Sequence, residues 1–245
     1  GDEFDWWFAR NPAGSLMSVA RDDGQVLGVA AHSLYRAVLG GEEQLASFSV
    51  HATTVPAARG RGIFVALERK HEQEAQARGV AVVLAFASAP TIPLFLGPLG
   101  WTEIARYRIW ARALPFGGKR AEPIEAFEGG DAAAGWPNHL VRDTAYLNWR
   151  YLDSPRDYAA FRTDGGYAVL GHKRHRGRDV ALVQGDGQQR VAAQLEEVVG
   201  GADPEWATLV RPTLSVVRQP AVAMVEAAWD LLMQRVNRVG GPLRT

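Results

Sequence analysis

The strongest constraint on the fold is a run of four elements in the first half of the chain: strand, glycine-rich turn, helix and strand. Residues 44–55 have the composition of a strand, and residues 62–78 repeat apolar side chains on one helical face, with Gly79 as the stop. Residues 80–88 are a nearly continuous apolar run, which is typical of a strand covered on both faces. This order predicts an α/β fold on a mixed (α+β) sheet.

An uncharged stretch runs from position 79 to position 101 and is long enough to cross a bilayer. Its second half contains Pro90, Pro93 and Pro98, each of which would break a spanning helix. A broken backbone exposed to lipid would leave polar groups without partners. We therefore predict a buried strand and then a short helix over 91–97, and no membrane partner.

Similar elements surround this unit and recur later in the chain. Residues 16–20 and 25–39 predict an antiparallel pair of strands, and residues 101–113 predict another strand. The second half repeats the order strand, helix, strand, helix, strand, at 179–184, 189–199, 206–211, 221–228 and 231–239. The repeated order predicts two similar lobes, 1–113 and 138–245.

The segment between the two lobes, residues 114–137, is rich in glycine, proline and alanine and predicts a linker. A helix is expected after it at 144–151, with Asp143 as its N-cap, and a strand at 166–170.

Composition excludes several classes of protein. The 27 Lys and Arg residues balance 27 Asp and Glu residues, which argues against a nucleic-acid partner. The chain has no cysteine, so a disulfide framework, a thiolate zinc site and a cysteine nucleophile are excluded. A cysteine-free chain fits a cytoplasmic location, and the first residues do not resemble a signal peptide. Composition leaves the oligomeric state open.

The turn between strand and helix carries two glycines and two arginines: Arg59, Gly60, Arg61 and Gly62. Glycine permits positive φ and close approach of a ligand to the backbone. Free N–H groups at the start of a helix, with arginines beside them, suit a pyrophosphate. The alternative is a tight connection with exposed arginines and no ligand.

Two other phosphate motifs do not fit this turn. A P-loop requires Lys and then Ser or Thr after the last glycine, and neither follows Gly62. A dinucleotide fingerprint requires a third glycine, where Phe64 or Val65 stands, and an acidic residue at the end of the next strand.

The order strand, Val-Pro-x-x-Arg-Gly-Arg-Gly-Ile, helix, apolar strand and Leu99-Gly100-Trp101 resembles the GNAT superfamily of N-acetyltransferases. The resemblance covers about residues 7–113. Residues 142–151 resemble, more weakly, the second lobe of tandem members. Asp186 stands where a second anion would bind, so the resemblance implies a degenerate second lobe and a single coenzyme site.

The resemblance implies the acyl-CoA N-acyltransferase fold, with acetyl-CoA or another acyl-CoA as co-substrate. Two groups of residues would bind it through their backbones. The end of the first strand would hold the pantetheine arm and the acyl carbonyl, at Thr53, Thr54 and Val55. The turn would hold the pyrophosphate, at Arg59, Gly60, Arg61, Gly62, Ile63 and Phe64.

Catalytic residues are less evident. The tyrosine that many members use as the acid for the leaving thiolate is Leu96 here, and the asparagine often found after the apolar strand is Ser88. Candidates for a general base are His51, Glu43 and Ser49. Histidine can exchange a proton near neutral pH, but strand alternation does not tell which face His51 occupies, and a structural or surface histidine stays an alternative. No local spacing marks a metal site.

The expected reaction is transfer of an acetyl or other acyl group from acyl-CoA to the amine of a small-molecule acceptor, by direct attack in a ternary complex. Two alternatives stay open. One is a catalytically silent module of the same fold that senses coenzyme A or a small ligand. The other is O-acyl transfer to a sugar.

Overall fold

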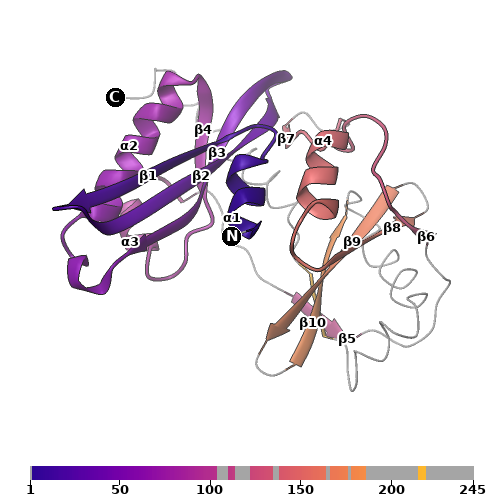
Figure 1. Ribbon diagram of the computed structural model, residues 1–245. Helices are drawn as coiled ribbons and strands as arrows, with labels where there is room; N and C mark the ends of the chain where they lie inside the picture. Colours follow the sequence, from indigo (N-terminus) through magenta and orange to yellow (C-terminus); the bar gives the residue numbers. More distant parts are fainter. Residues whose placement is uncertain are drawn as a thin grey trace. The chain divides into compact units, whose positions relative to one another are not determined.

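The computed structural model describes most of the first half of the chain and parts of the second: residues 2–103, 110–113, 122–134, 138–163, 166–175, 178–185 and 215–218. The chain divides into two compact units (Figure 1). Unit 1 comprises Gly1–Ile104 and Pro137–Val141, and unit 2 comprises Ala105–Trp136 and Arg142–Thr245. Within the described residues, no helix combines the length and the apolar character that a membrane span requires.

Unit 1 is built on a mixed sheet in the order β1, β2, β3, β4, with β7 paired to β2 (Figure 1). The strands are β1 (Ser15–Asp22), β2 (Gln25–Leu39), β3 (Glu42–Thr54), β4 (Val80–Ala85) and β7 (His139–Leu140). The pairs β1–β2 and β2–β3 are antiparallel, whereas β3 and β4 are parallel. The mixed sheet and the predicted antiparallel pair are therefore confirmed.

Helical segments cover both faces of this sheet: α1 (Asp2–Phe4), η1 (Asp5–Ala9), η2 (Pro56–Ala58), α2 (Ile63–Ala77) and α3 (Ile92–Leu96). Helix α2 joins β3 to β4 and packs against all four long strands. On η1, Trp7 donates from Nε1 to Ser33 Oγ. Ser33 follows His32, whose side chain contacts α2. Since neighbouring strand residues point to opposite faces, η1 and α2 lie on opposite sides of the sheet.

The core under α2 is formed by Leu16, Leu34 and Ala75, which are at most 2% exposed. Replacing Leu34 with alanine is expected to lower the free energy of unfolding of unit 1 by about 2–5 kcal/mol, since the cavity lies between sheet and helix. Urea unfolding followed by tryptophan fluorescence measures this. Val19→Ala, at a site that is 42% exposed on β1, is the control and should stay within about 0.5 kcal/mol.

The structure differs from the start of the strand predicted at 101–113, and residues 104–109 of that prediction lie outside the described residues. Residues 101–103 are not in a strand, and β5 (Trp110–Ala113) pairs with β11 (Ser215–Arg218) in the sheet of unit 2. The indole N–H of Trp101 donates to Glu72, and the ring lies 4.6 Å from that of Phe95. Trp101 therefore packs against α2 and α3.

A second difference concerns residues 137–141, which the sequence placed at the end of the linker and the start of the second lobe. They belong to unit 1, where β7 pairs with Ala37 and Val38 of β2. The backbone N–H of Gly40 donates to Asn138 Oδ1 at 2.7 Å. The strand β1 pairs with the first part of β2 only, as far as Ser33, and β7 occupies the same edge beyond it.

Unit 2 contains a sheet in the order β5, β11, β10, β9, β8, β6. Its other strands are β6 (Glu122–Pro123), β8 (Tyr158–Thr163), β9 (Gly166–His175) and β10 (Arg178–Gly185). Its helical segments are α4 (Thr144–Leu147) and η3 (Asn148–Leu152). Asp143 Oδ1 accepts from the N–H of Tyr146 at 2.9 Å, which confirms the predicted N-cap.

Much of the predicted second lobe lies outside the described residues, including the elements expected at 189–199, 206–211, 221–228 and 231–239. The strand β10 is found where 179–184 predicted one, and β11 is found where no element was expected. The prediction of two similar lobes stays a prediction.

Candidate functional site

The turn before α2 has the backbone conformation that its glycines allow. Gly60 has φ +78° and Gly62 has φ +76°, a region that side-chain-bearing residues rarely adopt, so the predicted positive φ is confirmed at both positions. A Cβ atom added at either glycine would meet no atom within 4 Å. The glycines are therefore required by the backbone conformation and not by crowding within the protein.

The N-terminus of α2 presents unpaired backbone donors. Gly62 is the N-cap and has no side chain that could accept from them. The first hydrogen bond of the helix runs from Ala66 N to Gly62 O. The N–H groups of Ile63, Phe64 and Val65 precede it in the chain and therefore have no acceptor within the helix. Together with the positive end of the helix dipole, these donors suit an anion.

Both arginines of the turn are exposed. Arg59 donates from Nε to the carbonyl oxygen of Thr54 at 3.3 Å. The guanidinium of Arg61 lies 3.6 Å from a carboxylate oxygen of Asp22, in the turn between β1 and β2. Arg61 is thus partly neutralised by Asp22, whereas Arg59 keeps its charge for a ligand beside the end of β3.

The strands β3 and β4 stop pairing before β3 ends. Their last matched residues are Ser49 and Ala85, and within the described part of the chain β3 continues to Thr54 paired with β2 alone. Thr53 and Val55 are exposed and Thr54 is half-buried. Among the described residues, no strand pairs with the edge of this segment that faces away from β2, which leaves backbone donors next to the glycine turn.

A β-bulge lies at the start of this free segment. Ala31 is opposite His51 and His32 is opposite Ser49, so Val50 is the extra residue on β3. A bulge reverses the face that following side chains occupy. His51 therefore lies on the η1 side, with its ring centroid 5.8 Å from those of Trp7 and Phe8, and it is exposed.

The other proposed catalytic residues lie elsewhere. Glu43, near the start of β3, is bound by Arg36 through two hydrogen bonds of 2.7 and 2.8 Å. Ser88 lies after β4, where its hydroxyl is 3.1 Å from that of Thr91 at the beginning of α3. The structure therefore brings His51 close to the free end of β3, places Glu43 at the other end of that strand, and places Ser88 in a turn.

The sequence comparison agrees with this geometry. Residues 3–104 match the family model described as an acetyltransferase (GNAT) domain. Unit 1 belongs to the GNAT superfamily. No curated protein matches the chain.

Solved structures similar to the GNAT domain come from several sources. One is an acetyltransferase from Trypanosoma brucei, with 20% identity, TM-score 0.36, and coverage of 41% of this chain and 70% of the other. Another is an aminoglycoside acetyltransferase from an uncultured soil metagenomic sample, with 23% identity, TM-score 0.33, and coverage of 40% and 66%. A third is glucosamine-6-phosphate N-acetyltransferase from Arabidopsis thaliana, with 12% identity, TM-score 0.35, and coverage of 44% and 66%.

In this GNAT domain the position of the usual tyrosine acid is Leu96, the last residue of α3. Leu96 is 42% exposed and carries no titratable group.

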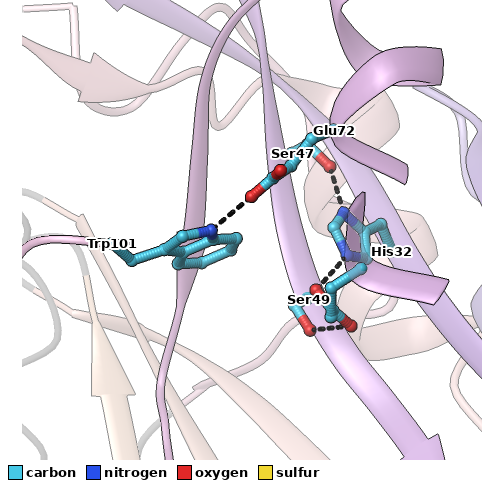
Figure 2. A network of polar contacts seen from close by, with 6 residues as sticks. His32, Ser47, Ser49, Glu72 and Trp101 are labelled. Atoms are coloured by element: carbon cyan, nitrogen blue, oxygen red, sulfur yellow. Dashed lines mark hydrogen bonds and ion pairs between the residues drawn. The ribbon is translucent and has the colours of Figure 1, made fainter. Parts of the chain in front are cut away.

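A buried polar cluster lies between the sheet and α2, and local sequence spacing did not reveal it. Its hydrogen bonds are drawn in Figure 2. His32 Nδ1 lies 2.9 Å from Ser47 Oγ, and its Nε2 lies 2.9 Å from Glu68 Oε2. Ser49 donates to Glu68 Oε1 at 3.1 Å. His32 and Glu68 are 36 positions apart, so only the fold brings them together.

A second histidine, His71, completes this cluster. Its ring centroid is 4.5 Å from that of His32, and like His32 and Glu68 it is fully buried. Burial, and then the neighbouring His32, lower the pKa of His71 from 6.5 to about 4. His71 is therefore a neutral imidazole at physiological pH.

Proposed function

We propose that the chain transfers an acetyl or other acyl group from acyl-CoA to the amine of a small-molecule acceptor. The observation that carries the proposal is the turn at residues 59–62, where two glycines at positive φ open the N-terminus of α2 beside the unpaired end of β3. The backbone N–H groups from Arg61 to Phe64 would bind the pyrophosphate. The segment from Thr53 to Val55 would bind the pantetheine arm.

The divergence of β3 from β4 supports a thioester placed at the bulge. The acceptor would approach from the η1 side, because α2 covers the other face of the sheet. The amine nitrogen then attacks the thioester carbonyl carbon, the C–N bond forms and the C–S bond breaks. Backbone N–H groups of β3 beyond Ser49 would stabilise the oxyanion.

Two proton transfers accompany this step. His51 is proposed to accept the proton of the attacking amine, since it is exposed on the η1 side beside the bulge. The thiolate leaves with a proton from solvent, since Leu96 cannot supply one. The rest of the rate enhancement would come from holding the two substrates together.

Titration calorimetry with acetyl-CoA tests the binding step. We expect binding to one site per chain, since the degenerate second lobe predicts no second one. Absence of measurable binding would contradict the proposal.

Arg59→Ala is expected to weaken acetyl-CoA binding by about 10–100-fold, because a charge-assisted hydrogen bond contributes about 1.5–3 kcal/mol. Calorimetry at two salt concentrations would show the loss and a weaker salt dependence. Lys70→Ala removes an exposed cation from α2. It serves as the control and should bind acetyl-CoA like the wild type.

A second function is favoured by Leu96: a GNAT-fold module that binds coenzyme A or a small ligand without turnover. An assay for the release of free coenzyme A in the presence of a panel of amines and amino sugars distinguishes the transferase from the module without turnover. Turnover with any member of the panel supports the transferase, and mass spectrometry of the product tells N-acylation from O-acylation. Binding without release across the panel supports the sensor.

A further inference from the structure

The cluster of His32, Glu68 and His71 has the composition of a metal site. One ligand atom from each residue lies within 4.8 Å of the others, and all three side chains are fully buried. Glu68 and His71 are three positions apart on α2, so they share a helical face directed at β2, which supplies His32. Two imidazoles and one carboxylate are a ligand set that binds zinc and other divalent transition metals.

As a purely protein-filled core, this cluster is poorly satisfied. Neither ring nitrogen of His71 has a hydrogen-bond partner in the part of the chain that the structure describes. Buried polar groups nearly always have partners, so such an imidazole requires an explanation. Glu68 is a buried carboxyl whose contacts within the described residues are His32 and Ser49, with no Lys or Arg among them. A divalent cation would give His71 the partner that it lacks and would place a positive charge beside the Glu68 carboxylate.

The hydroxyls of two serines hydrogen-bond to the proposed ligands and fix the orientation of their side chains. The hydrogen bond between Ser47 Oγ and His32 Nδ1 holds the imidazole so that its Nε2 faces Glu68 and His71. Ser49 donates a hydrogen bond to Glu68 Oε1, so that the other carboxylate oxygen, Oε2, faces His32. Hydrogen bonds of this kind fix the orientation of metal ligands in known sites.

We propose that His32, Glu68 and His71 bind a zinc ion between β2 and α2. Zinc suits this set because it takes nitrogen and oxygen ligands and tolerates a closed, buried site. Metal–ligand bonds of about 2 Å place tetrahedral ligand atoms roughly 3.3 Å apart, so the ion draws together atoms that now lie up to 4.8 Å apart.

The role of this ion is structural. Complete burial keeps substrate away from it, and the ion joins the second turn of α2 to the middle of the sheet. The same helix begins at Gly62, so the ion would also hold the glycine turn in place. Ligands that bind the folded state alone raise the melting temperature with concentration. Unit 1 is therefore expected to melt at a higher temperature with zinc than after its removal.

The test uses the full chain without a histidine tag, stripped by a chelator, dialysed and titrated with zinc chloride. We expect one tight site per chain by calorimetry and by elemental analysis after gel filtration, together with a rise in melting temperature. Cobalt(II) in place of zinc should give the visible absorption of a nitrogen- and oxygen-ligated ion.

The deciding variant is His71→Leu. It removes a ligand, but in a metal-free core it merely replaces an unpaired imidazole with an apolar side chain of similar size, so the protein should fold. We expect zinc affinity to fall by more than about 100-fold, since even loss of a second-shell partner costs 10–100-fold. Glu68→Gln should do the same, and Glu74→Gln, a partly exposed carboxylate on the same helix, should bind zinc like the wild type.

The proposal is overturned if the wild type binds no stoichiometric zinc, or if His71→Leu binds it as tightly as the wild type. The latter result would place the zinc on another residue, such as His172 or His175, which every variant retains. Acetyl-CoA titration of the same samples is read separately, so failure of the metal site and failure of the proposed transferase are distinguishable.

Discussion

Gly62→Trp is expected to abolish acetyl-CoA binding while the protein stays folded. Gly62 has φ +76°, and a side chain there meets no protein atom, so the indole would occupy the space that the pyrophosphate needs. The backbone strain costs about 1–3 kcal/mol of stability, which lowers the melting temperature without unfolding the chain. We expect affinity to fall by more than about 100-fold, equivalent to roughly 3 kcal/mol of binding free energy. Calorimetry and thermal melting measure the two effects.

The matched control for this variant is Gly41→Trp. Gly41 also has positive φ, +87°, and also has no atom within 4 Å of an added Cβ. It lies in the turn between β2 and β3, at the opposite end of β3 from the glycine turn, roughly 40 Å away at strand spacing. Gly41→Trp should lose similar stability and keep acetyl-CoA binding. If both variants bind acetyl-CoA equally well, the glycine turn is not part of the coenzyme site.

His51→Gln is expected to lower kcat by about 10²–10⁴-fold and to leave the KM for acetyl-CoA unchanged. The reason is that His51 is exposed, lies one residue after the bulge and comes after the last residue of β3 that pairs with β4. Steady-state kinetics with the first acceptor found in the amine panel measure both.

Glu43→Gln provides the comparison for His51→Gln. Glu43 is held by Arg36 near the other end of β3, so its removal should change kcat less than about twofold while costing at most about 1 kcal/mol of stability. A large loss of kcat in Glu43→Gln with none in His51→Gln would reverse the assignment of the base.

The order of the main strands and the long helix of unit 1 follows from local sequence patterns. The apolar run at 80–88 and the glycines before and after the predicted helix mark β4 and α2, because their physical causes act within a few residues of sequence. The start of the strand predicted at 101–113 could not be predicted in the same way, since residues 101–103 are not in a strand. Whether an alternating segment joins a sheet depends on what its first residue contacts, and Trp101 is held by Glu72 and Phe95.

The candidate site likewise combines features that the local sequence predicts with features that depend on tertiary structure. Positive φ at Gly60 and Gly62 could be predicted from residue type alone. The orientation of His51 could not, because simple alternation would place it on the face of Ser47 and Ser49, under α2. One extra residue, Val50, turns it to the other face, and a bulge leaves little trace in a single sequence. The contact of His32 with Glu68 depends on tertiary structure in the same way.

The pairing of β7 with β2 has a consequence for synthesis on the ribosome. A chain grows at about 5–20 residues per second, and domains generally fold in order from the N-terminus. Here the first unit cannot complete its sheet when residue 104 emerges, since its edge at Ala37 and Val38 is still missing His139 and Leu140. An open strand edge is a template for association with other chains. The nascent protein therefore carries an unprotected edge for several seconds, until the whole intervening segment of unit 2, Ala105–Trp136, has also been made.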